Sequence, residues 1–211
     1  MRTRIIIACA LAGSSPCFAQ VQRTVPPISA TYEVEHERLL ADGRKLIANE
    51  SHRWYRDSQG RTRLDQTNIV TITDPVSRFI YILDPGKRTA RRVTLPYQAV
   101  GRSTPAPTPG QLEDRGAIST RVIEGYEAVG KETVLVTPPN PRLGNREPLE
   151  NRLQVWTSNK LKLPLLTVVD DPLNGRRTQR YTNIVAGVEP DAYLFQIPAD
   201  YQLLDVHPTV Q

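Results

Sequence analysis

The side chains that most often carry out catalysis or hold metals are few and scattered in this sequence. Two of the three histidines, His36 and His52, should lie on neighbouring strands joined by the Asp42-Gly43 turn. Counting back from that turn places His36 opposite residue 49 or 50, so it would meet His52 only diagonally. Metal sites need clustered ligands. This spacing therefore indicates ordinary strand positions and predicts no metal site.

The acidic pairs are no better placed for chemistry. Asp170-Asp171 and Glu113-Asp114 are sequence neighbours, and neighbouring residues of a strand point to opposite faces. A glycosidase needs two carboxyl groups that face each other across a sugar, so turn formation is the better interpretation of Asp170-Asp171. No Gly-x-Ser-x-Gly elbow, phosphate-binding loop or dinucleotide fingerprint occurs in the sequence. We therefore expect no catalytic residues, no cofactor and no enzyme.

Residues 1–19 have the pattern of a secretory signal peptide. Two arginines precede a run of about nine apolar residues, and the small residue Ala19 marks the predicted cleavage point. The apolar run is shorter than the roughly 20 residues that span a bilayer. Lipoprotein signals place a small residue before the anchored cysteine, whereas Pro16 precedes Cys17, so anchoring at Cys17 is not expected. The predicted location is the periplasm.

Cleavage would remove both cysteines, Cys9 and Cys17, from the chain. Residues 20–211 are then expected to form a single domain without disulfides, since a chain of this length can bury an adequate core. The net charge of +5 includes the two arginines of the signal, and the remaining cations are spread along the chain. With no helix-turn-helix, zinc-finger or aromatic-basic pattern, nucleic acid is not an expected partner.

The elements that position these side chains are strands. Apolar and polar residues alternate from Ile28 to Val34, and turn clusters recur about every 8 to 15 residues. No window shows an amphipathic helix of three turns, and Gln111–Ala117 is the best candidate for a short one. The pattern predicts an all-β or β-dominated α+β fold. We expect one large curved antiparallel sheet, an open half-barrel of about 11 strands with few helices.

Residues 96–114 read as a long Pro-rich loop, because this stretch holds four prolines and few apolar residues. A loop of this length suggests a lid, a partner-binding segment or slack between two halves of one sheet. The sequence leaves these three alternatives open.

Aromatic residues are concentrated in the expected strands. They are Tyr32, Trp54, Phe79, Tyr81, Trp156, Tyr181, Tyr193 and Phe195. Such residues either fill a core against the sheet or line a hollow on its concave face, which helices would otherwise cover. On the second interpretation, the candidate ligand-binding residues are Tyr32, Val34, Trp54, Phe79, Tyr81 and Trp156.

The order of motifs between residues 50 and 203 resembles a known superfamily. A Gly-Tyr pair and a valine-rich strand precede a tryptophan strand, a Leu-Pro strand, a hairpin with glycine, an Asn-Ile strand and a terminal Phe-x-x-Pro. These motifs are Gly125-Tyr126, Trp156, Leu163-Pro164, Asn174-Gly175, Asn183-Ile184 and Phe195–Pro198. The chain resembles the LolA-like periplasmic lipoprotein carriers, the sigma-factor regulator RseB and, most closely, uncharacterised exported domains of the same superfamily.

The resemblance implies an open β-barrel whose better-known members bind acyl chains or lipids on a concave apolar face. It departs from the carriers in two respects, because residues 28–40 read as a strand where they have an amphipathic helix, and no helix that could cover the barrel mouth is evident. The expected function is an exported binding protein for a lipid, an acyl chain or another apolar ligand. The alternative is an envelope interaction or sensor module of the RseB type. Expected partners are a lipid or lipoprotein acyl chain, an envelope protein and a peripheral membrane surface.

Overall fold

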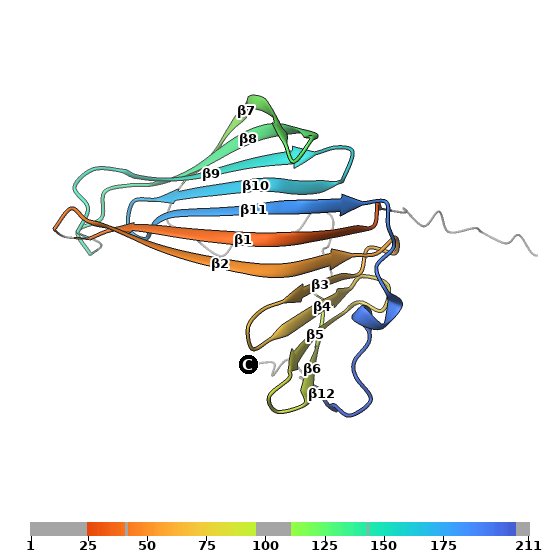
Figure 1. Ribbon diagram of the computed structural model, residues 1–211. Coiled ribbons are helices and arrows are strands. Elements are labelled where there is room, and N and C mark those ends of the chain that lie inside the picture. Colours follow the sequence, from red (N-terminus) through yellow and green to blue (C-terminus); the bar gives the residue numbers. More distant parts are fainter. Residues whose placement is uncertain (1–24, 41, 96–110, 143, 206–211) are drawn as a thin grey trace, which may run out of the picture.

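The computed structural model describes residues 25–40, 42–95, 111–142 and 144–205. The expected signal peptide and residues 96–110 of the expected Pro-rich loop lie outside these ranges. The described residues form twelve strands in a single sheet (Figure 1), in the order β12-β6-β5-β4-β3-β2-β1-β11-β10-β9-β8-β7. No helix in the described ranges is long and apolar enough to cross a bilayer.

The strands of the first half are β1 (Ile28–Leu39), β2 (Lys45–Arg56), β3 (Thr62–Asp65), β4 (Val70–Asp74), β5 (Phe79–Asp84) and β6 (Thr89–Thr94). Those of the second half are β7 (Gln111–Ile123), β8 (Tyr126–Thr137), β9 (Leu149–Ser158), β10 (Leu163–Asp171) and β11 (Gly175–Ala186). A short 3-10 helix, η1 (Ala192–Phe195), leads to β12 (Gln202–Asp205).

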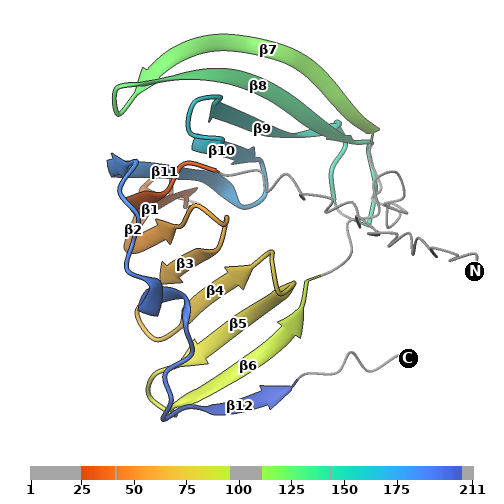
Figure 2. The same cartoon turned by 90° about the vertical axis from the view of Figure 1, so that its right-hand side faces the viewer.

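Each half of the chain is a run of antiparallel hairpins, and β1 joins them by pairing with β11. Strand β12 then returns to pair parallel with β6, which makes β7 and β12 the two edges of the sheet. Figure 2 shows the sheet curving strongly while these two edges stay apart. The expected all-β, open and curved sheet is thus confirmed.

The turn between β1 and β2 follows the sequence signal closely. Gly43 has a φ of +82°, a conformation that glycine adopts without the steric cost of a Cβ atom. The Asp42 carboxylate accepts a hydrogen bond from the Arg44 amide at 3.0 Å, and the Leu40 amide donates to the Arg44 carbonyl at 2.8 Å. These bonds close the loop and set the register of the hairpin.

Two clusters of buried side chains stabilise the sheet. The first consists of Ile28, Ala30, Trp54, Ala128, Trp156, Leu161, Leu163, Leu165 and Val168. The second consists of Val70, Ile72, Leu83, Ala90 and Phe195. Because Phe195 belongs to η1, the segment between β11 and β12 covers one face of strands β4 to β6.

A buried guanidinium holds three separate segments together at one end of the first cluster. Arg56 donates to the carbonyl of Pro26 from Nε at 3.1 Å and from Nη2 at 2.9 Å. It also donates to the carbonyls of Leu161 at 2.5 Å and Lys162 at 3.1 Å. Burial lowers the pKa of Arg56, and the carbonyl oxygens compensate for the lost hydration of the cation.

Two expectations from the sequence are wrong. Gln111–Ala117 is not a helix but the start of β7, so the last four residues of the expected 96–114 loop lie in a strand. A segment this short gains little as an isolated helix, whereas pairing with β8 satisfies its backbone groups. Gly116, with a φ of +76°, also interrupts a helical path.

Tyr193 and Phe195 were expected in a strand and instead lie in η1. This segment crosses the sheet rather than joining it, so its backbone is satisfied by local bonds from Leu194 to Asp191 and from Gln196 to Tyr193. A smaller difference concerns the first hairpin. His36 lies opposite Ala48 rather than residue 49 or 50.

Candidate functional site

Three of the six candidate residues share one face of the central strands. Tyr32 lies on β1, and its ring centroid is 5.2 Å from that of Tyr181 on β11, which is in turn 4.9 Å from that of Trp54 on β2. Gln179 donates a hydrogen bond to the Tyr32 hydroxyl, and burial raises the pKa of Tyr181. Val34, two residues after Tyr32, is buried on the same face.

Phe79 and Tyr81 lie on the opposite face. Cross-strand pairing carries one row of side chains from Tyr55 through Arg63 and Ile72 to Tyr81. Tyr55 follows Trp54 directly in β2, so the two rows point to opposite sides of the sheet. Tyr81 packs against the second cluster, and the Arg92 guanidinium lies 4.7 Å from the centroid of Phe79.

Trp156 is held within the sheet rather than over a hollow. Its indole Nε1 donates to Ser119 Oγ at 3.1 Å, and the Arg121 guanidinium lies 4.2 Å from the ring centroid. The ring spans Gly130, which is directly opposite Trp156 on β8. Pairing places Trp156 in one row with Leu166, and that row lies on the face opposite to Val34.

The six candidates therefore do not line one continuous surface. Tyr32, Val34 and Trp54 lie on one face, and Phe79 and Tyr81 lie on the other. Trp156 joins the first cluster through the end of β10, where a bulge between Pro164 and Leu166 interrupts the register. These residues were predicted from their type and their expected strands, and the strand pairing places them on different faces of the sheet.

A hollow on the face of Val34 provides a better candidate site. Pairing carries one row from Val34 through Gln179, Thr167 and Val155 to Lys131, across five strands. At the far end of this row, strands β8 and β9 form an open hollow of about 570 Å³. It is lined by Val129, Lys131, Thr133, Leu153, Val155, Thr157 and Asn159.

The lining of this hollow suits an amphiphile. Three aliphatic side chains and two threonine methyl groups offer apolar surface, while Lys131 and Asn159 supply a cation and an amide. No carboxylate in the described ranges forms an ion pair with Lys131, so no described residue neutralises its charge. Pockets of roughly 300–1,000 Å³ commonly hold small molecules. The alternation of Leu153, Val155 and Thr157 was the sequence signal for this surface. It was not among the predicted site residues because these were chosen mainly for their aromatic side chains.

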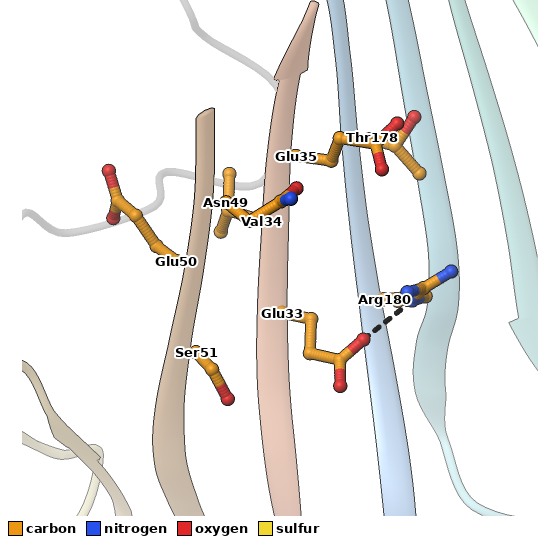
Figure 3. Close-up of a pocket in the computed structure, with 8 residues that line it drawn as sticks. All are labelled: Glu33, Val34, Glu35, Asn49, Glu50, Ser51, Thr178 and Arg180. Carbon is orange, nitrogen blue, oxygen red and sulfur yellow. Dashed lines mark hydrogen bonds and ion pairs between the residues drawn. The ribbon is translucent and has the colours of Figure 1, made fainter. Parts of the chain in front are cut away.

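A second pocket, of about 320 Å³, lies across β1, β2 and β11 and is polar (Figure 3). Figure 3 shows Glu33 and Arg180 joined across β1 and β11, with Nε to Oε2 at 2.7 Å. The hydrogen bond from Arg180 is the main reason that the pKa of Glu33 lies below its ordinary value. Glu35 and Glu50 also line this pocket. Three carboxylates make it unsuitable for an acyl chain or an anion.

The polar pocket has no arrangement for covalent or metal catalysis among the residues that the structure describes. Ser51 has no hydrogen-bond partner there that could act as its base. Glu50 is bound instead to His52, with Oε2 to Nε2 at 3.1 Å. Within the same ranges, no group of three or more potential ligands could hold a metal ion. The arrangement can bind polar groups.

No protein-family model and no curated protein sequence matches this chain. Among solved structures, the chain is similar to MucB in complex with MucA(peri), with 16% identity over 86% of this chain and a TM-score of 0.45. That likeness spans only 57% of MucB. An uncharacterised conserved protein from Thermus thermophilus is 15% identical, with 85% of this chain and 90% of that one covered and a TM-score of 0.44.

A LolA superfamily protein from Nitrosomonas europaea is 10% identical, with 84% of this chain and 92% of that one covered and a TM-score of 0.34. The neighbours expected from the sequence are thus found at low identity. At these values the likeness carries no argument about what the chain does. What the chain binds has to be argued from its own residues.

Proposed function

We propose that this chain is an exported, periplasmic binding protein that holds an amphiphile with an acyl chain and an anionic head group. The hollow between β8 and β9 would receive the acyl chain against Val129, Leu153 and Val155. The head group would meet the ammonium group of Lys131. The observation that carries the proposal is an aliphatic lining beside Lys131, a cation with no ion-pair partner among the described residues, on an open sheet.

The same face offers a path for a longer chain. From the hollow, the row of paired residues leads through Thr167 on β10 to Gln179 on β11, whose amide donates to the Tyr32 hydroxyl. The aromatic group of Tyr32, Trp54 and Tyr181 lies next to Val34 on this face. Burial of apolar surface contributes about 0.8 kcal/mol per methylene. A ligand that extends along this row would therefore bind more tightly as its chain lengthens.

The test is equilibrium binding of a fluorescent fatty acid to delipidated protein. Val155→Gln places a polar amide in the lining and should weaken binding on the order of tenfold. Lys131→Gln should weaken binding of the fatty acid but leave a monoacylglycerol, which has no charge, bound as before. The matched control is Val185→Gln, because Val185 is an exposed valine that pairs with Ser29, on the face opposite to the hollow.

Two results would contradict the proposal. One is that delipidated protein binds neither the fatty acid nor the monoacylglycerol. The other is that Val155→Gln and Val185→Gln have equal effects, since only Val155 lies in the hollow. Circular dichroism of each variant separates loss of binding from loss of fold.

A second candidate function, the envelope interaction module, is favoured by one observation. Strand β7 is an edge of the sheet, and its Leu112 and Val122 are 70% and 75% exposed. Unpaired edges of this kind accept an added strand from a partner. Val122→Lys should then weaken capture of a purified envelope partner without altering fatty-acid binding. If the wild type and the Val122→Lys variant capture the envelope partner equally well, this alternative is refuted.

A further inference from the structure

The hairpin of β1 and β2 extends beyond the rest of the sheet. Pairing of β1 with β11 ends at Glu37 and Arg176, and pairing of β2 with β3 begins only at Arg53. Within the part of the chain that the structure describes, the residues between these limits and the turn therefore have only each other as strand partners. Figure 1 shows the hairpin as the outermost point at one end of the sheet. We call residues 38–40 and 42–47 the hairpin tip.

The hairpin tip exposes large apolar side chains. Leu39 is 66% exposed, Leu46 55%, Ile47 52% and Leu40 36%. A tip exposed to water is normally polar, because apolar side chains there gain nothing from burial. A group of four apolar residues at the end of a protruding hairpin indicates that another surface covers it.

These side chains project from both faces of the hairpin. Leu46 lies opposite Arg38, and Leu39 lies opposite Lys45. The two pairs are adjacent along the strands, so they point to opposite sides. A protein partner or a second copy that docks on one face would leave the other face in water. The interface of a bilayer surrounds whatever enters it and would cover both.

The charges of the tip complement an anionic membrane. Arg38, Arg44 and Lys45 are cations, and Asp42 is the one carboxylate of the tip. Arg44 pairs with Asp42 at 2.7 Å, and Lys45 pairs with Glu37 at 2.5 Å, but both cations stay more than half exposed. Such exposed pairs are weak. Each cation can therefore turn toward a phosphate while its aliphatic stem stays among the apolar residues.

We propose that the hairpin tip inserts into the interface of an anionic phospholipid bilayer. At about 3.4 Å per residue, residues 38–40 extend roughly 10 Å beyond Glu37. Interfacial segments bury their apolar side chains about 5–10 Å into the boundary between head groups and acyl chains. The tip is long enough for this depth while the rest of the sheet remains outside. The inference is independent of the amphiphile site.

The test is co-sedimentation of the purified protein with vesicles of equal parts phosphatidylglycerol and phosphatidylcholine. The protein should bind these vesicles, bind pure phosphatidylcholine more weakly, and lose the difference as salt is raised. The double variant Leu46→Ser/Ile47→Ser should bind on the order of a hundredfold more weakly, about tenfold for each side chain. Arg38→Gln/Lys45→Gln should weaken binding only to the anionic vesicles.

The matched control removes equally exposed apolar residues elsewhere. Val76 and Val188 are 60% and 62% exposed and lie outside the hairpin, so Val76→Ser/Val188→Ser should bind as the wild type does. A second measurement uses Leu46→Trp, whose emission should shift to the blue when anionic vesicles are added. Both native tryptophans, Trp54 and Trp156, are buried and should not shift.

The proposal is overturned if the wild type does not bind the anionic vesicles. It is also overturned if Leu46→Ser/Ile47→Ser binds as the wild type does, or if the control variant loses binding equally. A concentration-dependent dimer that the same variant abolishes, with vesicle binding unchanged, would assign the tip to a second copy instead. Because Val155 is remote in the pairing order from the tip, Val155→Gln should leave vesicle binding intact. The two proposals can therefore fail separately.

Discussion

Replacing Gly130 by alanine tests how tightly the indole of Trp156 is held against β8. A Cβ atom added at Gly130 would lie 2.5 Å from Nε1 of Trp156 and 2.9 Å from its Cδ1 and Cε2. Ordinary contacts to a Cβ atom begin at about 3.4 Å, so the ring has to move. The Ser119 hydroxyl and the Arg121 guanidinium contact the same ring and restrict where it can go.

The cost follows from these contacts. Overpacking a well-filled site costs about 1–3 kcal/mol, and the hydrogen bond to Ser119 contributes about 1 kcal/mol more if it breaks. We therefore expect Gly130→Ala to lower the free energy of unfolding by about 2–4 kcal/mol. Ser119→Ala alone should cost about 1 kcal/mol, and the double variant should cost less than the sum of the two single ones.

The assay is urea unfolding followed by tryptophan fluorescence and circular dichroism. Gly86→Ala is the control, because a Cβ atom there would come no closer than 3.4 Å to Asp84 Oδ1 and the glycine has no positive φ. The reasoning fails if Gly130→Ala costs no more than Gly86→Ala and leaves the emission spectrum of the folded protein unchanged.

Two further predictions concern charged groups. Arg56→Met should lower the free energy of unfolding by about 3 kcal/mol, because three backbone carbonyls lose their donor while a methionine fills the space; an unchanged melting temperature would contradict this. Glu33, whose pKa is lowered chiefly by the hydrogen bond from Arg180, binds more protons unfolded than folded as the pH falls through about 4.5. Stability should therefore decrease as the pH falls below about 4.5, and Glu33→Gln should show a shallower decrease in thermal melts at acid pH.

Local patterns predicted the strands well. The alternation from Ile28 to Val34 reports one wet and one dry face, and the Asp42-Gly43 turn has the conformation that its residues favour. The misassigned segments were those in which local preference was weak. Gln111–Ala117 lies in a strand because it pairs with β8. Phe195 lies outside the strands because its side chain is buried in the second cluster.

Part of the candidate surface was also readable from the sequence. Tyr32 and Val34 are two residues apart, and so are Phe79 and Tyr81, so each pair had to share a face of its strand. The hollow between β8 and β9 was less visible. Its valines and threonines are ordinary strand residues, and only the pairing of β8 with β9 shows that they gather beside Lys131.

Periodicity along the chain was enough to predict the strands, the positions of most turns and hence an all-β open sheet. It could not determine which strands share a dry face. That depends on the register across each hairpin, and a shift of one residue in any turn moves every side chain of the next strand to the other side. Trp54 and Tyr81 are separated by three such turns. Tertiary pairing alone placed them on opposite faces, and it alone put Val34, Val155 and Lys131 in one row.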